Sequence, residues 1–231
     1  MKYETVREGI FQDRPNRFIA YVRLDGETVV CHVKNTGRCR ELLIPGVTVY
    51  LAEGSNPSRK TKWDLVAVKK GNRVVNIDSQ APNKVAAEAL PQIFPQASLI
   101  RPETTFGTSR FDFYLETPER RIFLEVKGVT LEEDGVVRFP DAPTERGVKH
   151  IRELMACIDE GYEAYVLFVI QMKQVRYFTP NVETHPTFGE VLREASAKGV
   201  KILAYDCEVL PGEMTLREPV EVRILEEERR A

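Results

Sequence analysis

The sequence has few residues of the kinds that build metal clusters, disulfide frameworks or membrane spans. Its four cysteines include no Cys-x-x-Cys pair, and its three histidines are scattered, so a zinc site is not expected. No apolar run approaches the roughly 18 residues that a membrane span needs, and the N-terminal segment lacks the pattern of a signal peptide. We therefore expect a cytoplasmic protein with reduced thiols and no membrane partner.

The sequence also lacks an overall excess of charge of one sign, because its formal net charge is −2. The charge is unevenly distributed, however. Residues 1–80 carry 14 Lys and Arg against 9 Asp and Glu, whereas residues 81–231 carry 19 against 26. A basic first part beside an acidic second part is typical of a polyanion-binding module next to a metal-binding carboxylate site. Uneven composition without functional meaning is the alternative.

Residues 1–80 have the pattern of short strands joined by tight turns. The expected strands are residues 5–11, 17–24, 27–33, 47–52, 63–69 and 73–77. Asp25-Gly26 is a hairpin signal between two of them. Five or six short strands in so short a segment favour a small closed β-barrel of the OB type. An SH3-like barrel and half of a sandwich fit the pattern nearly as well.

Residues 81–231 change to an alternation of strands and helices. A helix is expected over residues 82–90, and Thr144 and Thr187 are expected to cap two further helices. Residues 164–170 (AYVLFVI) predict a strand buried on both faces, and residues 200–205 predict another. This order of elements indicates an α/β domain with right-handed crossovers.

The most informative segment is residues 109–131, which predicts two strands around a turn at Pro118-Glu119. With that turn, Asp112 faces Glu125 at a Cβ separation of about 4.5–5.5 Å, and Lys127 projects from the same strand face as Glu125. Two carboxylates so close repel unless a cation lies between them, and Mg²⁺ or Mn²⁺ is the natural candidate. Lys127 would then stabilise the attacking hydroxide or a phosphoryl oxygen. A solvated strand face with cross-strand ion pairs is the alternative.

Several cationic residues are candidates for contact with nucleic acid. They are Arg38 and Arg40 in a glycine turn, Lys60 and Lys62 beside Trp63, Arg110 near Asp112, and Arg146 and Lys149 at a helix N-terminus. Helix N-termini attract phosphate, and an aromatic side chain beside cations can stack on a base. The alternatives are surface charge for the cations and a core position for the only tryptophan. Glu103 could supply a third carboxylate to the metal site.

A series of motifs carries a family resemblance. NTGRCRELLIPG, KTKWDLVAV, IDSQAPN, FGTSRFDFYLE, LEVKGVTL and FPDAPTERGVKHIREL follow in this order. Together they resemble the sugar fermentation stimulation protein A family over about residues 3–225. Asp112 with Glu125-x-Lys127 also resembles the signature of the restriction-endonuclease-like PD-(D/E)xK superfamily.

The resemblance implies an OB-like barrel over residues 1–80 and a nuclease-like α/β domain with a mixed sheet over residues 81–231, an α+β protein overall. It implies that Asp112 and Glu125 bind magnesium and that Lys127 is catalytic. It also implies DNA binding and a role in regulating sugar (maltose) utilisation.

Three hypotheses follow. In the first, the protein binds DNA, single- or double-stranded and without sequence specificity, and cuts it at a Mg²⁺ or Mn²⁺ centre. In the second, the centre is catalytically silent and the protein is a DNA-binding regulator. In the third, it is a scaffold whose basic barrel face binds a protein. The first two predict an affinity for nucleic acid that falls steeply with salt. The sequence leaves the oligomeric state open, a homodimer included.

Overall fold

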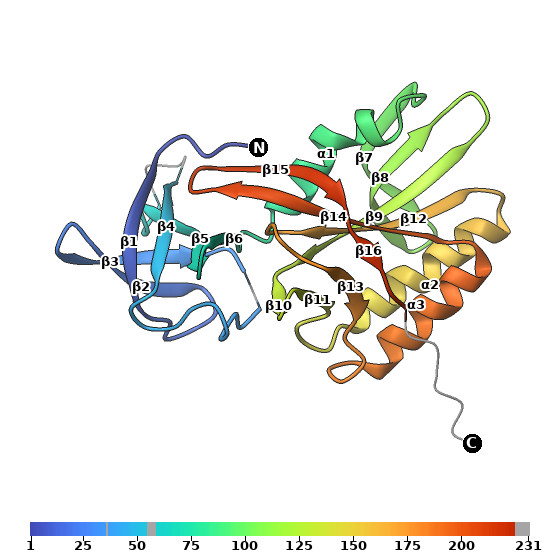
Figure 1. The fold of residues 1–231 in the computed structure, drawn as a ribbon. Helices are drawn as coiled ribbons and strands as arrows, with labels where there is room; N and C mark the ends of the chain where they lie inside the picture. Colours follow the sequence, from blue (N-terminus) through green and yellow to red (C-terminus); the bar gives the residue numbers. More distant parts are fainter. Residues whose placement is uncertain (36, 55–58, 225–231) are drawn as a thin grey trace, which may run out of the picture.

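The computed structural model describes residues 1–35, 37–54 and 59–224 (Figure 1). A small all-β part, at the left of the view, adjoins a larger α/β part at the right. Among the described residues, no helix is long and apolar enough to cross a membrane. The chain is α+β overall, as predicted.

The first part is a barrel of the OB type. Its strands are β1 (Val6–Asp13), β2 (Ile19–Leu24), β3 (Glu27–Val33), β4 (Thr48–Glu53), β5 (Trp63–Lys70) and β6 (Arg73–Asn76). Strand β1 pairs with both β2 and β4, and β3 pairs in parallel with β5, which closes β1 to β5 into a barrel. The closed barrel confirms the prediction of an OB-type barrel, and it excludes the alternative of half a sandwich. Asp25 and Gly26 both have positive φ, as a tight hairpin turn requires.

The second part is built on a mixed six-stranded sheet in the order β15-β14-β12-β9-β8-β7. Its strands are β7 (Leu99–Phe106), β8 (Ser109–Glu116), β9 (Arg121–Val129), β12 (Glu163–Ile170), β14 (Lys201–Leu210) and β15 (Glu213–Pro219). Strand β12 runs parallel to β9 and β14 and is almost fully buried, as its apolar sequence predicts. A smaller sheet consists of β10 (Leu131–Glu133), β11 (Val136–Phe139), β13 (Tyr177–Pro180) and β16 (Glu221–Val222).

Helices cover both faces of the mixed sheet. Helix α1 (Ala81–Ile93) packs on one face, and α2 (Glu145–Asp159) and α3 (Pro186–Lys198) pack together on the other. Thr144 caps α2 as predicted, because its Oγ1 accepts a hydrogen bond from Gly147 N at 3.1 Å. The predicted cap at Thr187 is wrong. Helix α3 already begins at Pro186, a residue suited to the first helical position, and His185 is the N-cap residue.

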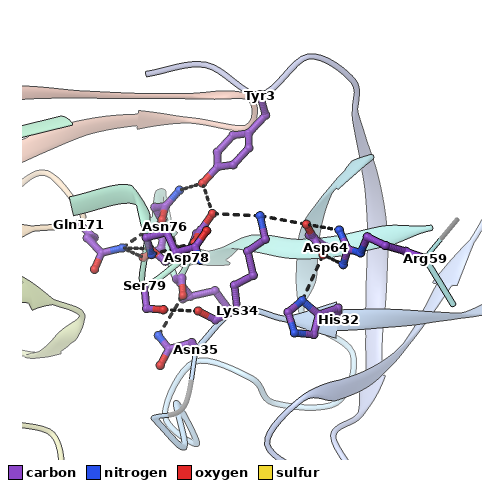
Figure 2. Close-up of polar contacts among 12 residues, drawn as sticks. Tyr3, His32, Lys34, Asn35, Arg59, Asp64, Asn76, Asp78, Ser79 and Gln171 are labelled. Carbon is purple, nitrogen blue, oxygen red and sulfur yellow. Dashed lines mark hydrogen bonds and ion pairs between the residues drawn. The ribbon is translucent and has the colours of Figure 1, made fainter. Parts of the chain in front are cut away.

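The two parts are joined by a buried polar junction (Figure 2). Gln171, which follows β12, donates from Nε2 to Asn76 O and Asn76 Oδ1, both at 3.0 Å, and to Asp78 O at 3.2 Å. Tyr3 Oη donates to Asp78 Oδ2 at 3.2 Å. Gln171, Asn76 and Asp78 are almost completely buried, so these hydrogen bonds replace lost contacts with water.

The junction continues into the barrel through Asp64, a buried carboxylate on β5. Arg59 donates to both of its oxygens, and Lys34 Nζ lies 3.0 Å from Oδ2. Burial would raise the pKa of Asp64, but hydrogen bonds from Arg59 and Lys34 and their charge hold it below its usual value. One apolar core also includes residues of both parts, so the barrel and the α/β part pack as one body.

Candidate active site

The β8–β9 hairpin has the predicted register. Its tight turn lies at Pro118-Glu119, because Thr117 N donates to Arg120 O at 2.8 Å. Phe113 pairs with Leu124, and Glu116 pairs with Arg121. Continued by one residue, this register places Asp112 across from Glu125, as the sequence predicted.

Asp112 is held by two hydrogen bonds. Asn83 Nδ2, on α1, donates to Oδ1 at 2.6 Å, and Val126 N donates to Oδ2 at 2.7 Å. Burial and the negative charge of Glu125 nevertheless raise the pKa of Asp112 above its ordinary value. Ionised Asp112 is therefore in an environment that favours an added cation.

Glu125 is 3% exposed, and its two oxygens differ. Oε1 lies 2.5 Å from Lys127 Nζ and 2.5 Å from His150 Nδ1, whereas Oε2 is buried without a hydrogen-bond partner. Burial would raise the pKa of Glu125, but the hydrogen bonds from His150 and Lys127 and the charge of Lys127 lower it. The site thus holds an ionised carboxylate with one buried oxygen left unsatisfied.

These two carboxylates fit a divalent cation. Mg²⁺ is commonly held by one or two carboxylates, with waters and substrate phosphates completing its coordination. The unsatisfied Glu125 Oε2 beside Asp112 supplies such an oxygen set. Within residues 1–35, 37–54 and 59–224, no group of three or more His, Cys, Asp or Glu side chains could hold a metal ion. Asp112 and Glu125 are therefore the two carboxylates that a divalent cation would use here.

The prediction of Glu103 as a third ligand is wrong. The backbone of Glu103 has a positive φ of 51°, and β7 pairs with β8 on either side of it, Pro102 with Phe113 and Thr104 with Phe111. Its side chain is 68% exposed and pairs with Arg110 at 3.5 Å. Arg110 is thus engaged by a carboxylate at the surface.

The N-terminal turn of α2 lies beside the carboxylates. Arg146 is exposed and donates from Nε to His150 Nε2 at 3.4 Å, which links it through His150 to Glu125. This pattern makes Nδ1 the protonated nitrogen of His150, because Nε2 accepts. Lys149 instead lies 3.7 Å from Glu153, and half of its side chain is exposed.

The basic candidates of the barrel do not form a single surface with Trp63. Trp63 is 7% exposed and belongs to the core, so its predicted role as a base-stacking platform is wrong. Lys62 lies over its ring at 5.1 Å and pairs with Glu53 at 3.4 Å. Lys60 is exposed. Arg38 and Arg40 are exposed and line one cavity on the barrel.

Sequence reasoning missed two residues of the site. Neither His150 nor Asn83 is among the site residues that the sequence predicts. The signal for His150 is its position four residues after Arg146, which places both side chains on one helix face. Asn83 has no comparable signal, because its contact with Asp112 depends on the packing of α1 against the sheet.

The fold and the site together define a protein with an OB-type barrel and a mixed α/β sheet whose central hairpin carries paired carboxylates. Models of known families match both parts. The chain belongs to the sugar fermentation stimulation protein A (SfsA) family. Residues 13–77 match the SfsA N-terminal OB domain, and residues 80–213 match the sugar fermentation stimulation protein RE domain.

The relatives cover the chain almost completely. A sugar fermentation stimulation protein homolog of Desulfitobacterium hafniense (strain Y51) is 60% identical over 98% of this chain and 100% of its own. Its counterpart in Clostridium beijerinckii is 57% identical over 96% of this chain and 99% of its own. The structure of Pyrococcus furiosus SfsA in complex with Ca²⁺ is 29% identical, with a TM-score of 0.86 over 96% of this chain and 98% of that one.

Proposed function

We propose that the protein is a metal-dependent DNA phosphodiesterase whose centre is formed by Asp112, Glu125 and Lys127. The observation that carries the proposal is Glu125 Oε2, which is buried without a hydrogen-bond partner next to a second carboxylate. A buried unsatisfied carboxylate oxygen costs stability unless something binds it. The structure of Pyrococcus furiosus SfsA is a complex with Ca²⁺, a cation that takes oxygen ligands, as Mg²⁺ and Mn²⁺ do.

Each residue of the centre has a distinct role in the proposal. A bound Mg²⁺ or Mn²⁺ supplies Lewis acidity and favours the ionisation of coordinated water. Asp112 and Glu125 hold the ion, and Asn83 and Val126 N fix the carboxylate of Asp112. Lys127 Nζ, 2.5 Å from Glu125, stabilises negative charge that develops on the phosphoryl group.

The outer contacts orient the centre and bind substrate. His150 is a positioning residue, because it donates to Glu125 Oε1 and leaves Oε2 for the ion. Exposed Arg146, at the N-terminus of α2, binds a phosphate of the strand, and the helix dipole adds to this attraction. On the barrel, Arg38, Arg40, Lys60 and Lys62 contact the DNA backbone without reading its sequence.

The four cysteines support a reducing compartment, and we assign the protein to the cytoplasm. Each is a free, buried thiol. Burial raises the pKa of Cys31, Cys39 and Cys157 to about 12, so these thiols remain protonated and unreactive at neutral pH.

A second candidate function is a catalytically silent DNA-binding regulator. The contact between Lys127 Nζ and Glu125 Oε1 favours it, because this ion pair neutralises the buried carboxylate without a metal ion. The regulated genes would be those of sugar utilisation, in keeping with the name of the family.

A cleavage assay separates the two functions. Labelled single-stranded, duplex and branched DNA would be incubated with the protein in Mg²⁺, in Mn²⁺ and in chelator. Glu125→Gln removes one carboxylate of the proposed centre, and Lys127→Ala removes its ammonium group. Glu103→Gln is the matched control, because Glu103 is an exposed carboxylate outside the site. We expect metal-dependent cleavage that both site variants lose and the control retains. Binding without cleavage under every condition would leave the silent regulator.

A further inference from the structure

A cavity of about 400 Å³ on the barrel has four arginines among its lining residues. It lies where the end of β1 meets the segment that leads to β2 and the segment between β3 and β4. The four arginines that line it are Arg14, Arg17, Arg38 and Arg40, against one carboxylate, Asp13. Its volume is in the range of small-molecule sites.

Arg14 holds the two segments that line the cavity together by hydrogen bonds. Its Nη1 donates to Gly37 O and Arg38 O, both at 2.8 Å, and its Nη2 donates to Arg17 O at 2.8 Å and Asn35 O at 2.7 Å. These bonds tie together the two segments from which Arg17 and Arg38 project. They engage carbonyl oxygens, so they leave the charge of Arg14 uncompensated, and its Nε is buried without a hydrogen-bond partner.

The other arginines of the cavity are exposed and free of ion pairs. Arg17, Arg38 and Arg40 make no salt bridge with any residue in the described part of the chain. Elsewhere on the surface, arginines such as Arg7, Arg217 and Arg223 do pair with a carboxylate. Asp141 approaches the far side of the loop, where a Cβ on Gly37 would lie 2.5 Å from its Oδ2. The four arginines leave a net positive local charge even with Asp13, Glu41 and Asp141 counted.

The lining also has an apolar side, formed by Phe11, Leu43 and Pro45. Guanidinium groups beside an apolar surface suit a ligand that carries both a phosphate and a flat ring, as a nucleotide does. A phosphodiester in the middle of a strand carries one negative charge, whereas a phosphate monoester carries about 1.5–2 at neutral pH. Several unpaired guanidinium groups around one cavity therefore match a monoester better than a diester.

We propose that this cavity binds the phosphate monoester of a nucleotide. Two kinds of ligand carry such a phosphate monoester: the phosphorylated end of a DNA strand and a free mononucleotide. In the first case the proposal rests on the proposed function and deepens it: the barrel holds a strand end, while the centre at Asp112 and Glu125 acts on the same strand. In the second case the cavity is a separate nucleotide site.

Two binding measurements in chelator test the proposal, because the proposed nuclease cannot cleave DNA without a metal ion. The first is fluorescence anisotropy with an internally labelled single strand whose ends are 5′-phosphorylated, 3′-phosphorylated or both hydroxyl. The second is calorimetric titration with a 5′-mononucleotide, a 3′-mononucleotide and inorganic phosphate. The proteins are wild type, Arg17→Gln, Arg38→Gln and the control Arg217→Gln, an exposed arginine on β15 that pairs with Glu208.

We expect one phosphorylated end to raise the affinity about tenfold, as one charge-assisted contact would. Arg17→Gln and Arg38→Gln should remove this preference, and Arg217→Gln should retain it. Mononucleotide binding that Arg17→Gln and Arg38→Gln weaken, without a preference among strand ends, would support the free nucleotide as the ligand. Equal affinity for all strand ends together with no mononucleotide binding would overturn the proposal. That result would leave the proposed nuclease function unaffected. Mononucleotide binding without any DNA binding in chelator would support the cavity as a separate nucleotide site, and the cleavage assay in Mg²⁺ would still decide the nuclease function.

Discussion

Gly128 lies next to Lys127 on β9, and its lack of a side chain lets the junction between the barrel and the α/β part pack closely against this strand. A Cβ at this position would lie 2.6 Å from Gln171 Oε1 and 2.7 Å from Pro82 Cγ. Gln171 is 2% exposed, and its amide makes hydrogen bonds to Asn76 and Asp78. The substitution Gly128→Ala must therefore displace Gln171, Pro82 or both.

Two contributions make up the expected loss in the free energy of unfolding. Overpacking a close-packed site costs about 1–3 kcal/mol. Weakening the buried hydrogen bonds of Gln171 adds about 1 kcal/mol. We therefore expect Gly128→Ala to lower the free energy of unfolding by about 2–4 kcal/mol. Urea unfolding of the metal-free protein, followed by tryptophan fluorescence, measures this change.

Two controls make the expectation specific. In Gly212→Ala the new Cβ would meet its nearest atom, Val6 Cγ2, at an ordinary 3.4 Å, so that change should stay within about 0.5 kcal/mol. In a Gln171→Ala background, Gly128→Ala should cost less than in the wild type, because one of the clashing groups is gone. A cost for Gly128→Ala as small as that of Gly212→Ala would refute the reasoning.

Three further predictions concern charge and burial. The pKa of Asp64 is lower in the folded than in the unfolded state, so its stabilisation is present above about pH 4 and is lost as the pH falls through the folded value. Asp64→Asn should lower stability at pH 7 by about 1–3 kcal/mol and flatten the acid limb of a stability–pH curve; an unchanged limb would contradict this. The pKa of Asp112 is raised by burial and by Glu125, so its ionisation costs stability above about pH 4. In chelator, the melting temperature of Asp112→Asn relative to the wild type should therefore rise as the pH increases above about 4; a difference that does not change with pH would count against it. Trp63→Phe should destabilise the barrel by about 1–3 kcal/mol and leave the affinity for single-stranded DNA unchanged, since Trp63 is in the core; a tenfold loss of affinity in anisotropy would restore the stacking role.

The parts of the fold that could be predicted from the sequence are those set by local chemistry. The turn at Pro118-Glu119 fixes the register of β8 and β9, so Asp112 and Glu125 could be placed opposite each other. Thr144 could be identified as a cap because its side chain bonds within its own helix. The closure of the barrel was only one of several options, because the β3–β5 pairing is non-local.

The remaining errors concern contacts between distant segments. Trp63 opens a strand next to basic residues, and only the packed barrel shows that its ring lies in the core. Glu103 is near Asp112 in sequence, but the positive φ of its backbone accompanies a side chain that points to Arg110 at the surface. His150 meets Glu125 only because α2 packs on the sheet. Tertiary packing decides each of these, and sequence spacing does not report it.

The most direct measurement is a titration of the metal-free protein with Mn²⁺, in which electron paramagnetic resonance counts the free ion. Wild type and Glu103→Gln should each bind Mn²⁺ at a site that Glu125→Gln and Asp112→Asn lose, while all four proteins remain folded by circular dichroism. Mn²⁺ binding that survives in both Glu125→Gln and Asp112→Asn would contradict the assignment of these carboxylates as the metal centre.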